Sequence, residues 1–186
     1  MGLTGKRRAV TRSAVRKAWQ ENLAWISDYG FCSYTREAIE DDYEDLRVCW
    51  CCGVTGYQEV AHIIPHSLGG THLPINSFLL CAECHLTSPD CSDPKYFVEF
   101  INRHAGRFNT AFAETFKRMT NRLLEFCEQE PEKAEAVQAA LSEQYLDSGG
   151  RISTHGSNYS ISTKMAGVEM ALDRAIELVQ RNPACK

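Results

Sequence analysis

The sequence predicts an α+β protein in which a small module containing β-strands is wrapped by α-helices on its N- and C-terminal sides. Two observations predict this class. Apolar residues recur at helical spacing before residue 27 and again from residue 97 onward, whereas residues 56–64, GYQEVAHII, have the composition of a β-strand. Two Cys-x-x-Cys pairs frame that strand, as expected for a small module held together by a metal ion.

The helices are predicted from apolar spacing and from their end signals. The first is expected over residues 11–26, with the apolar residues Val15, Trp19, Leu23 and Ile26. Asp93 and Pro94 begin a second helical region, because aspartate caps helix N-termini and proline fits the first helical position. Three helices follow, and we expect the aromatic stripe of one of them in the core; it contains Phe108, Phe112 and Phe116.

A polar stretch at residues 147–163 precedes a last helix that carries Met165 and Val179. The side chains of Arg151, His155 and Asn158 in this stretch suit phosphate or base-edge contacts, although an exposed connecting loop explains them equally well. The expected segments are therefore a basic N-terminal helical arm (1–46), a metal-binding module (47–92) and a C-terminal helical region (93–186) that includes the polar stretch.

Composition limits the class of protein. The hydrophobic fraction of 44% and the charged fraction of 24% are typical of a soluble globular chain, and no apolar run approaches the roughly 20 residues that cross a membrane. The N-terminus is basic but lacks the apolar region of a secretory signal, so we expect a cytoplasmic, reducing location. The odd number of cysteines, nine, then favours metal binding over disulfides.

Charge is unevenly distributed, although the net charge is only −4. Residues 1–20 carry six basic side chains and no acidic one, whereas residues 21–60 carry nine acidic side chains and two basic ones. The basic arm predicts an anionic partner, and a solvated helix end is the alternative. The arginines that we expect to contact the phosphates of such a partner are Arg7, Arg8, Arg12 and Arg16.

The cysteine pairs predict a structural zinc site. Cys49 and Cys52 form the first pair, and Cys81 and Cys84 form the second. Four thiolates suit tetrahedral Zn²⁺ and leave no open coordination position, so this ion is expected to hold the fold rather than to do chemistry. Four ordinary buried or free cysteines are the alternative interpretation, and Cys51 is a candidate substitute ligand.

The segment around these pairs resembles the HNH nuclease family. After the first pair, Ala61-His62-Ile63-Ile64 is followed by Pro65-His66-Ser67-Leu68-Gly69-Gly70, then by Asn76, and then by Leu80-Cys81-Ala82-Glu83-Cys84-His85. The resemblance covers residues 49 to about 90 and implies a ββα-metal fold with one catalytic Mg²⁺ or Mn²⁺. It implies that His62 activates water, that Asn76 orients His62, that His85 binds the metal, and that the cleaved DNA carries a 5′-phosphate.

Elementary chemistry agrees with these roles. Phosphodiester hydrolysis needs a base for water, positive charge near the phosphate and stabilisation of the departing oxygen, and a neutral imidazole with a divalent ion supplies these at pH 7. His66 is a candidate phosphate contact and is equally consistent with simple exposure in a loop. For His72 and His104 we expect ordinary core or surface roles.

The segment departs from the family at one position. The residue before the base commonly binds the metal in this family, but Ala61 has no donor atom. Asp90 and Glu59 are the nearby carboxylates that suit a hard ion, and we expect Asp90 to be the ligand because it lies five residues past His85, around the end of the helix expected there.

The sequence thus predicts a metal-dependent endonuclease of the HNH type that hydrolyses double-stranded DNA. The alternatives are a noncatalytic zinc-stabilised module that binds nucleic acid and a nuclease that acts on RNA. A homodimer is compatible with a double-strand cut by a one-site module. Restriction, homing, phage packaging and defence are all compatible roles.

Overall fold

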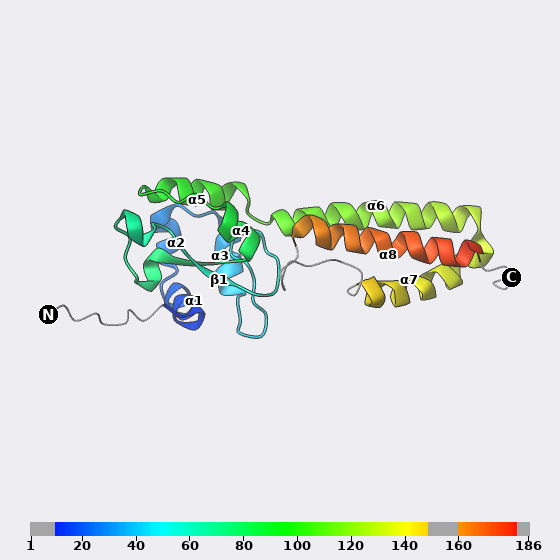
Figure 1. The fold of residues 1–186 in the computed structure, drawn as a ribbon, viewed down its shortest axis with the longest axis horizontal. Coiled ribbons are helices and arrows are strands. Elements are labelled where there is room, and N and C mark those ends of the chain that lie inside the picture. The colour runs from blue at the N-terminus through cyan, green and yellow to red at the C-terminus, as the bar shows by residue number, and fades with distance from the viewer. Residues whose placement is uncertain (1–9, 149–159, 182–186) are drawn as a thin grey trace. The chain divides into compact units, whose positions relative to one another are not determined.

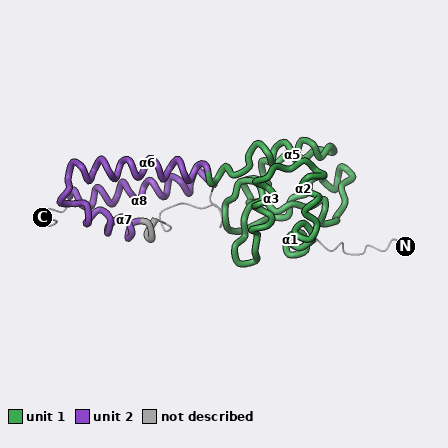
Figure 2. Tube along the Cα trace, turned by 180° about the vertical axis from the view of Figure 1, so that it is seen from behind, with its two compact units in different colours: residues 1–109 green, residues 110–186 purple. Residues whose placement is uncertain are grey.

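The computed structural model describes residues 10–148 and 160–181, and it divides into two compact units. The first unit comprises residues 1–109 and the second residues 110–186 (Figure 2). The boundaries predicted at residues 46 and 92 both fall inside the first unit, so the three expected segments stay a prediction. None of the described helices combines the length and the apolarity that a membrane crossing requires.

The first unit begins with three helices, α1 (Arg12–Glu21), α2 (Ala24–Tyr29) and α3 (Ser33–Glu40) (Figure 1). The hydroxyl of Thr11 caps α1 by accepting a hydrogen bond from the Ala14 amide at 3.2 Å. The single helix predicted over residues 11–26 is wrong, because the chain leaves helical geometry at Asn22 (φ −132°, ψ 55°) and then starts α2. Ile26, one of the apolar residues of the predicted helix, is buried in α2.

Trp19 of α1 is the centre of the core of the first unit. It is fully buried, and its indole N–H donates to the carbonyl oxygen of Ser77 at 2.8 Å. Its ring contacts five other aromatic rings: Trp25, Tyr29, Phe31, Trp50 and Phe78. These contacts join the N-terminal helices to the first cysteine pair and to the sheet.

The sheet consists of two antiparallel strands, β1 (Glu59–His62) and β2 (Ser77–Leu80). Glu59 pairs with Leu80 and His62 pairs with Ser77, so His62 lies at the end of the ladder where the connecting loop begins. That loop contains the 3₁₀ turns η1 (His66–Leu68) and η2 (Pro74–Asn76), and α4 (Ala82–Thr87) follows β2. The order strand, strand, helix and the mixed composition confirm the predicted α+β class.

Helix α5 (Pro94–Arg103) begins where the sequence predicted, with the Asp93 carboxylate accepting a hydrogen bond from the Lys95 amide at 2.9 Å. Helix α6 (Arg107–Gln129) starts in the first unit and continues into the second. The short turn η3 (Pro131–Lys133) and α7 (Ala134–Ser148) follow. The last helix, α8, is Ile161–Arg181, so the end of the polar stretch predicted over residues 147–163 is helical, while residues 149–159 lie outside the described ones.

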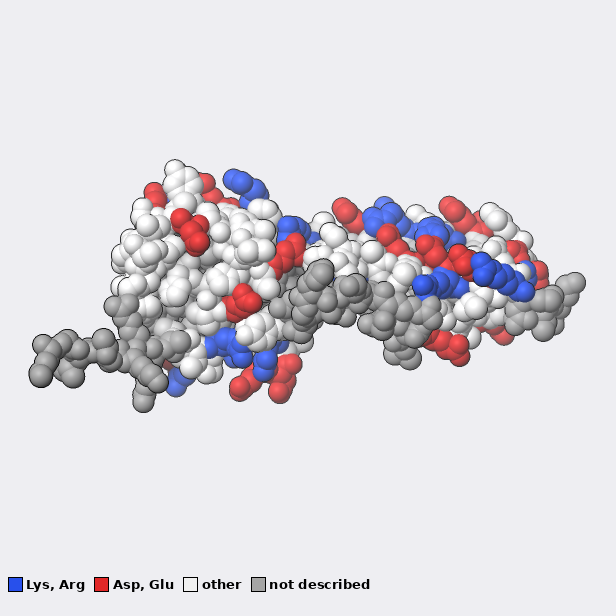
Figure 3. Space-filling view, in the orientation of Figure 1, with Lys and Arg blue, Asp and Glu red and all other residues white. Residues whose placement is uncertain are grey.

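The second unit packs α6, α7 and α8 around a small apolar core of Phe126, Val137, Ala175 and Val179. The core position predicted for the aromatic stripe of α6 is wrong for Phe112 and Phe116, which are 44% and 60% exposed. Ion pairs join α6 to α8, Arg118 with Glu169 at 2.7 Å and Arg122 with Asp173. On the face drawn in Figure 3, positive and negative side chains are interleaved along this unit.

Candidate active site

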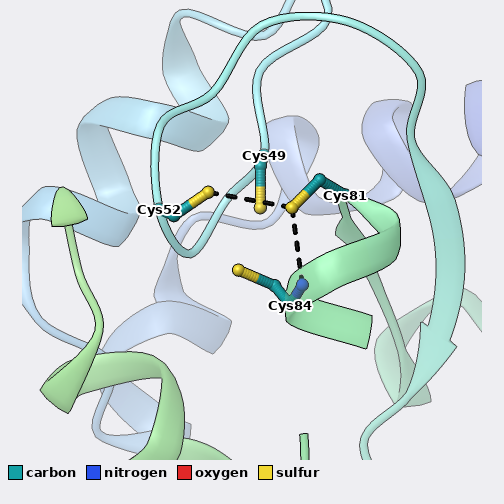
Figure 4. A group of neighbouring side chains, drawn as sticks. All are labelled: Cys49, Cys52, Cys81 and Cys84. Atoms are coloured by element: carbon teal, nitrogen blue, oxygen red, sulfur yellow. Dashed lines mark hydrogen bonds between the residues drawn. The ribbon is translucent and has the colours of Figure 1, made fainter. Parts of the chain in front are cut away.

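The four predicted zinc ligands converge on one point (Figure 4). Cys49 and Cys52 lie in a tight turn that Gly53 completes with a positive φ of 83°, and Cys81 and Cys84 lie at the start of α4. The four sulfur atoms are all within 4.8 Å of one another. Cys52 Sγ and Cys81 Sγ are 3.8 Å apart, which is about the edge of a tetrahedron with metal–sulfur bonds of roughly 2.3 Å.

The local chemistry of the cluster suits a metal ion that prefers thiolates. Side-chain hydrogen bonds within the cluster lower the pKa of Cys81 and raise the pKa of Cys52 and of Cys84, so the four thiols interact strongly with one another. Cys51, considered as a substitute ligand, is not one of the four; its sulfur lies 3.9 Å from the carbonyl oxygen of Ile101. These residues fit a structural zinc ion.

The connection between α5 and α6, together with the start of α6, is bonded to both cysteine turns. The amides of Gly106 and Phe108 donate to the carbonyl oxygens of Cys51 and Cys52 at 3.0 and 2.9 Å. Arg107, between them, pairs with Glu83 of the second cysteine turn at 2.8 Å. The start of α6 therefore depends on the same turns that hold the metal ligands.

His62, the predicted base, lies at the end of β1 with its side chain half-buried. Burial lowers its pKa, and the neighbouring imidazoles of His72, His66 and His85 lower it further, whereas Asp90 acts in the opposite direction. A lowered pKa favours the neutral ring, which is the form that accepts a proton.

His85, the predicted metal ligand, contacts Glu59. Its Nδ1 lies 2.7 Å from Glu59 Oε2, which joins α4 to β1. Strand side chains alternate between faces, so Glu59 shares a face with Ala61, and its longer side chain supplies a carboxylate on the face where Ala61 has none. Asp90, the carboxylate that the sequence favoured, lines the same cavity, but Glu59 is the carboxylate bonded to His85.

The cavity beside this pair has a volume of about 430 Å³ and is lined by Glu59, Ala82, His85, Leu86, Ser88 and Asp90. An imidazole and two carboxylates suit a hard divalent ion. Among the described residues, however, the four cysteines are the group that brings three or more ligand atoms together. An ion in the cavity would therefore take part of its coordination from water or a substrate phosphate, as Mg²⁺ commonly does.

Asn76 holds the loop that follows His62. Its side-chain oxygen accepts from the Ile64 amide at 3.0 Å, and its side-chain nitrogen donates to the carbonyl oxygens of Ile64 and Thr71, both at 2.9 Å. Gly70 is required beside it, because a Cβ there would lie 1.8 Å from the Ile64 oxygen. The bonds of Asn76 are thus to the main chain of the loop, so any effect on the His62 ring passes through that loop.

The loop also brings His66 and His72 to His62. The rings of His66 and His72 are stacked with centroids 4.3 Å apart, and the centroid of His72 is 5.7 Å from that of His62. We expected an ordinary core or surface role for His72. A sequence signal for another role was present, because residues 62–72 contain three histidines and no acidic residue.

The predicted DNA-binding arm is only partly described. Arg7 and Arg8 lie outside the described residues. Arg12 is half-buried; its guanidinium lies over the Tyr57 ring at 4.8 Å and donates to the carbonyl oxygen of Gln58 at 3.0 Å. Because Arg12 is only half-buried, part of its side chain is accessible at the surface.

Arg16 belongs to an internal network. It is 9% exposed, and its guanidinium donates to the Asp42 carboxylate at 3.0 Å and to the Gln58 side-chain oxygen at 2.9 Å. Asp42, fully buried, also accepts hydrogen bonds from the Trp50 indole and the Val48 amide. We therefore withdraw Arg16 from the expected phosphate contacts, because its charge is already neutralised inside the protein.

Comparison with known proteins gives one finding. Residues 47–89 match the family model described as HNH endonuclease, which confirms the resemblance over this segment. The matched segment contains both cysteine pairs, His62, Asn76 and His85. Searches of curated proteins and of solved structures found no match to the chain.

Proposed function

We propose that the protein is a metal-dependent HNH endonuclease that hydrolyses phosphodiester bonds of double-stranded DNA. The observation that supports this most directly is the position of His62. A half-buried imidazole with a lowered pKa lies at the end of β1, within the electrostatic reach of His85 and Asp90, which line the adjacent cavity. The family match over the same segment supports a nuclease-related activity.

In the proposed reaction, the neutral ring of His62 takes a proton from water as the water oxygen attacks phosphorus. The bond between phosphorus and the 3′-oxygen breaks, the 3′-oxygen leaves with its electron pair and is protonated from solvent, and the phosphate stays on the 5′ end. His85, Glu59 and Asp90 would hold a Mg²⁺ or Mn²⁺ ion. That ion supplies positive charge for the phosphate and the departing oxygen when it is bound.

Asn76 supports this reaction by fixing the loop after His62, and the cysteine cluster supports it by fixing the two strands relative to α4. A four-thiolate zinc ion has no open position for water, so its role in the proposal is structural.

The test is cleavage of supercoiled plasmid with Mg²⁺, with Mn²⁺ and with neither. The wild-type protein is expected to cleave only with a divalent ion. His62→Ala should lower the rate by about 10² to 10⁴-fold, because a positioned general base is worth that much. His104→Gln is the matched control, since it removes an imidazole that caps α5 by contact with the Phe100 carbonyl.

A second candidate, a noncatalytic zinc module that binds nucleic acid, is favoured by Ala61. This residue is 1% exposed and carries no donor atom at the position before His62. Binding of DNA without cleavage in any metal would support the module and would contradict the endonuclease. The same assay with labelled RNA distinguishes an RNA-directed nuclease, and sedimentation with DNA tests the expected homodimer.

A further inference from the structure

The loop between β1 and β2 presents a pair of imidazoles that the proposed reaction does not use. His66 lies in η1 and His72 lies between the two 3₁₀ turns, and both side chains are exposed. Their rings are stacked with an interplanar angle of 18°. We propose that the stacked His66 and His72 rings form a contact for a DNA phosphate beside His62. This proposal rests on the proposed function for the identity of the ligand.

The structure holds this pair in place from inside the protein. Asn76, 5% exposed, bonds to the main chain at Ile64 on one side and at Thr71, next to His72, on the other. The amide of Gly70 donates to the carbonyl oxygen of Pro65, next to His66, at 3.1 Å. The main chain beside each imidazole is therefore bonded to a buried part of the loop, which fixes the backbone positions from which the two side chains project.

The same bonds fix the pair relative to the predicted base. Ile64, which bonds to Asn76 through both its amide and its carbonyl group, is two residues after His62. The His72 ring meets the His62 ring at 74°, with centroids 5.7 Å apart. A phosphate in contact with the pair would thus lie next to the ring that is proposed to activate water.

The chemistry of the pair favours an anion. An imidazole has at least one N–H donor in either protonation state, so two rings offer at least two donors. The N–H groups of an imidazole lie in the plane of its ring, so those of the two stacked rings lie in nearly parallel planes, which suits the oxygens of one phosphate better than convergence on one metal ion. No acidic residue occurs from residue 63 to residue 80, so the loop itself offers no negative charge to repel the phosphate.

The experiment measures the affinity for a short fluorescent DNA duplex without Mg²⁺ or Mn²⁺, and then KM and kcat with the metal. The variants are His66→Phe and His72→Phe, which keep an aromatic ring but remove the donors, and His72→Gln, which keeps a donor. We expect each phenylalanine variant to raise the dissociation constant and KM by about tenfold, as the loss of one hydrogen bond to a charged group does, while kcat stays within about threefold. His72→Gln should recover part of the affinity.

Two controls separate binding from folding. His104→Gln should bind DNA as the wild type does, and the His66 and His72 variants should keep their zinc content and their thermal midpoint. Unchanged affinity in both phenylalanine variants would overturn the proposal. So would a loss of kcat alone, or equal losses for His72→Gln and His72→Phe, because the donor would then not be what matters.

The outcome is distinguishable from failure of the proposed function. If the wild type binds DNA but never cleaves it, the endonuclease proposal fails, and the affinity series still decides whether the pair contacts the phosphate. If the wild type binds no DNA, the imidazole proposal is overturned together with the proposed function.

Discussion

The imidazole of His62 has surroundings that keep it neutral. Burial removes water from the ring, and three neighbouring histidines add to the cost of a positive charge, so the pKa of His62 lies below its ordinary value of 6.5. A general base works in its deprotonated form. A lowered pKa therefore extends activity toward acidic pH, and raising the pH through neutrality leaves the base form fully populated.

We predict that the acidic limb of the kcat/KM profile for plasmid cleavage has its midpoint below pH 6.5, because this parameter reports the free protein. The measurement is the initial rate at low DNA concentration across pH 5 to 8 with Mn²⁺ held constant. His104→Gln should leave the midpoint unchanged. A midpoint at or above pH 6.5 would mean that another group is the base.

Asp42 makes a second residue-scale prediction, which concerns stability. Its carboxylate is fully buried and neutralises Arg16, so Asp42→Ala leaves a buried guanidinium without its counter-charge. Breaking such a pair typically costs about 3–5 kcal/mol of unfolding free energy. Urea unfolding of the first unit measures this loss. Asp41→Ala, at an exposed neighbouring position, should change the free energy of unfolding by less than about 0.5 kcal/mol.

Residues whose role depends on local spacing were predictable, and residues whose role depends on tertiary contact were not. The spacing of Cys49, Cys52, Cys81 and Cys84 predicted a cluster that the structure forms. The sequence did not show that Arg16 is buried, because its partner Asp42 is 26 positions away. The sequence also did not show that Glu59 contacts His85, because the approach of α4 to β1 brings together two residues that are 26 positions apart; Asp90 as a metal ligand stays a prediction.

Short elements were harder to predict than single motifs. Helix α3 lies partly within the acidic run that follows α2, and its buried face is short, with Thr35, Ala38 and Ile39 as its buried residues. The aromatic stripe of α6 was expected in the core because large apolar residues usually are, but the packed face of α6 instead carries Thr115 and Phe126. Apolar periodicity identifies a helix, but it does not show which face of that helix packs against the rest of the protein.

The cysteine turns and the start of α6 behave as one structural element. The first cysteine turn accepts backbone hydrogen bonds from the amides of residues 106 and 108, and Glu83 of the second turn pairs with Arg107. Loss of the metal should therefore loosen both strands, α4 and the first turn of α6 together. Structural zinc sites contribute roughly 10–16 kcal/mol in small domains at pH 7. The ion is therefore expected to decide whether the first unit folds.

We predict that protein purified without added metal contains about one equivalent of zinc, and that Cys84→Ser reduces this content and unfolds the first unit. Elemental analysis gives the stoichiometry, and tryptophan fluorescence reports the unit, since Trp19 and Trp50 are buried in its core. Cys91→Ser is the matched control, because Cys91 is not one of the clustered cysteines. Folded protein with far less than one equivalent of zinc would refute the assignment.

At the scale of the whole molecule, basic and acidic residues are concentrated in different segments, so the net charge does not describe any one segment. The chain is acidic in total, yet its first 20 residues carry only basic charges. The charge of Arg16 is neutralised inside the first unit, which leaves Arg7, Arg8 and Arg12 as the expected phosphate contacts of the arm. The ion pairs between α6 and α8 neutralise charge within the second unit, whereas residues 1–20 carry an excess of positive charge that no acidic residue of the same segment offsets.

The last prediction concerns this arm. Replacing Arg7, Arg8 and Arg12 by glutamine should weaken binding to every DNA sequence alike, because phosphate contacts carry no sequence information. Each replaced arginine that had bound a phosphate should reduce the slope of log affinity against log salt concentration by about 0.9, since fewer counterions are then released from the duplex. The measurement is the dissociation constant of a duplex from low to moderate salt.

The control is Arg36→Gln, which removes one positive charge elsewhere, at a side chain that is paired with Glu40 on α3. An unchanged slope in the triple variant would mean that the arm is a solvated helix end and that DNA is held by other parts of the protein.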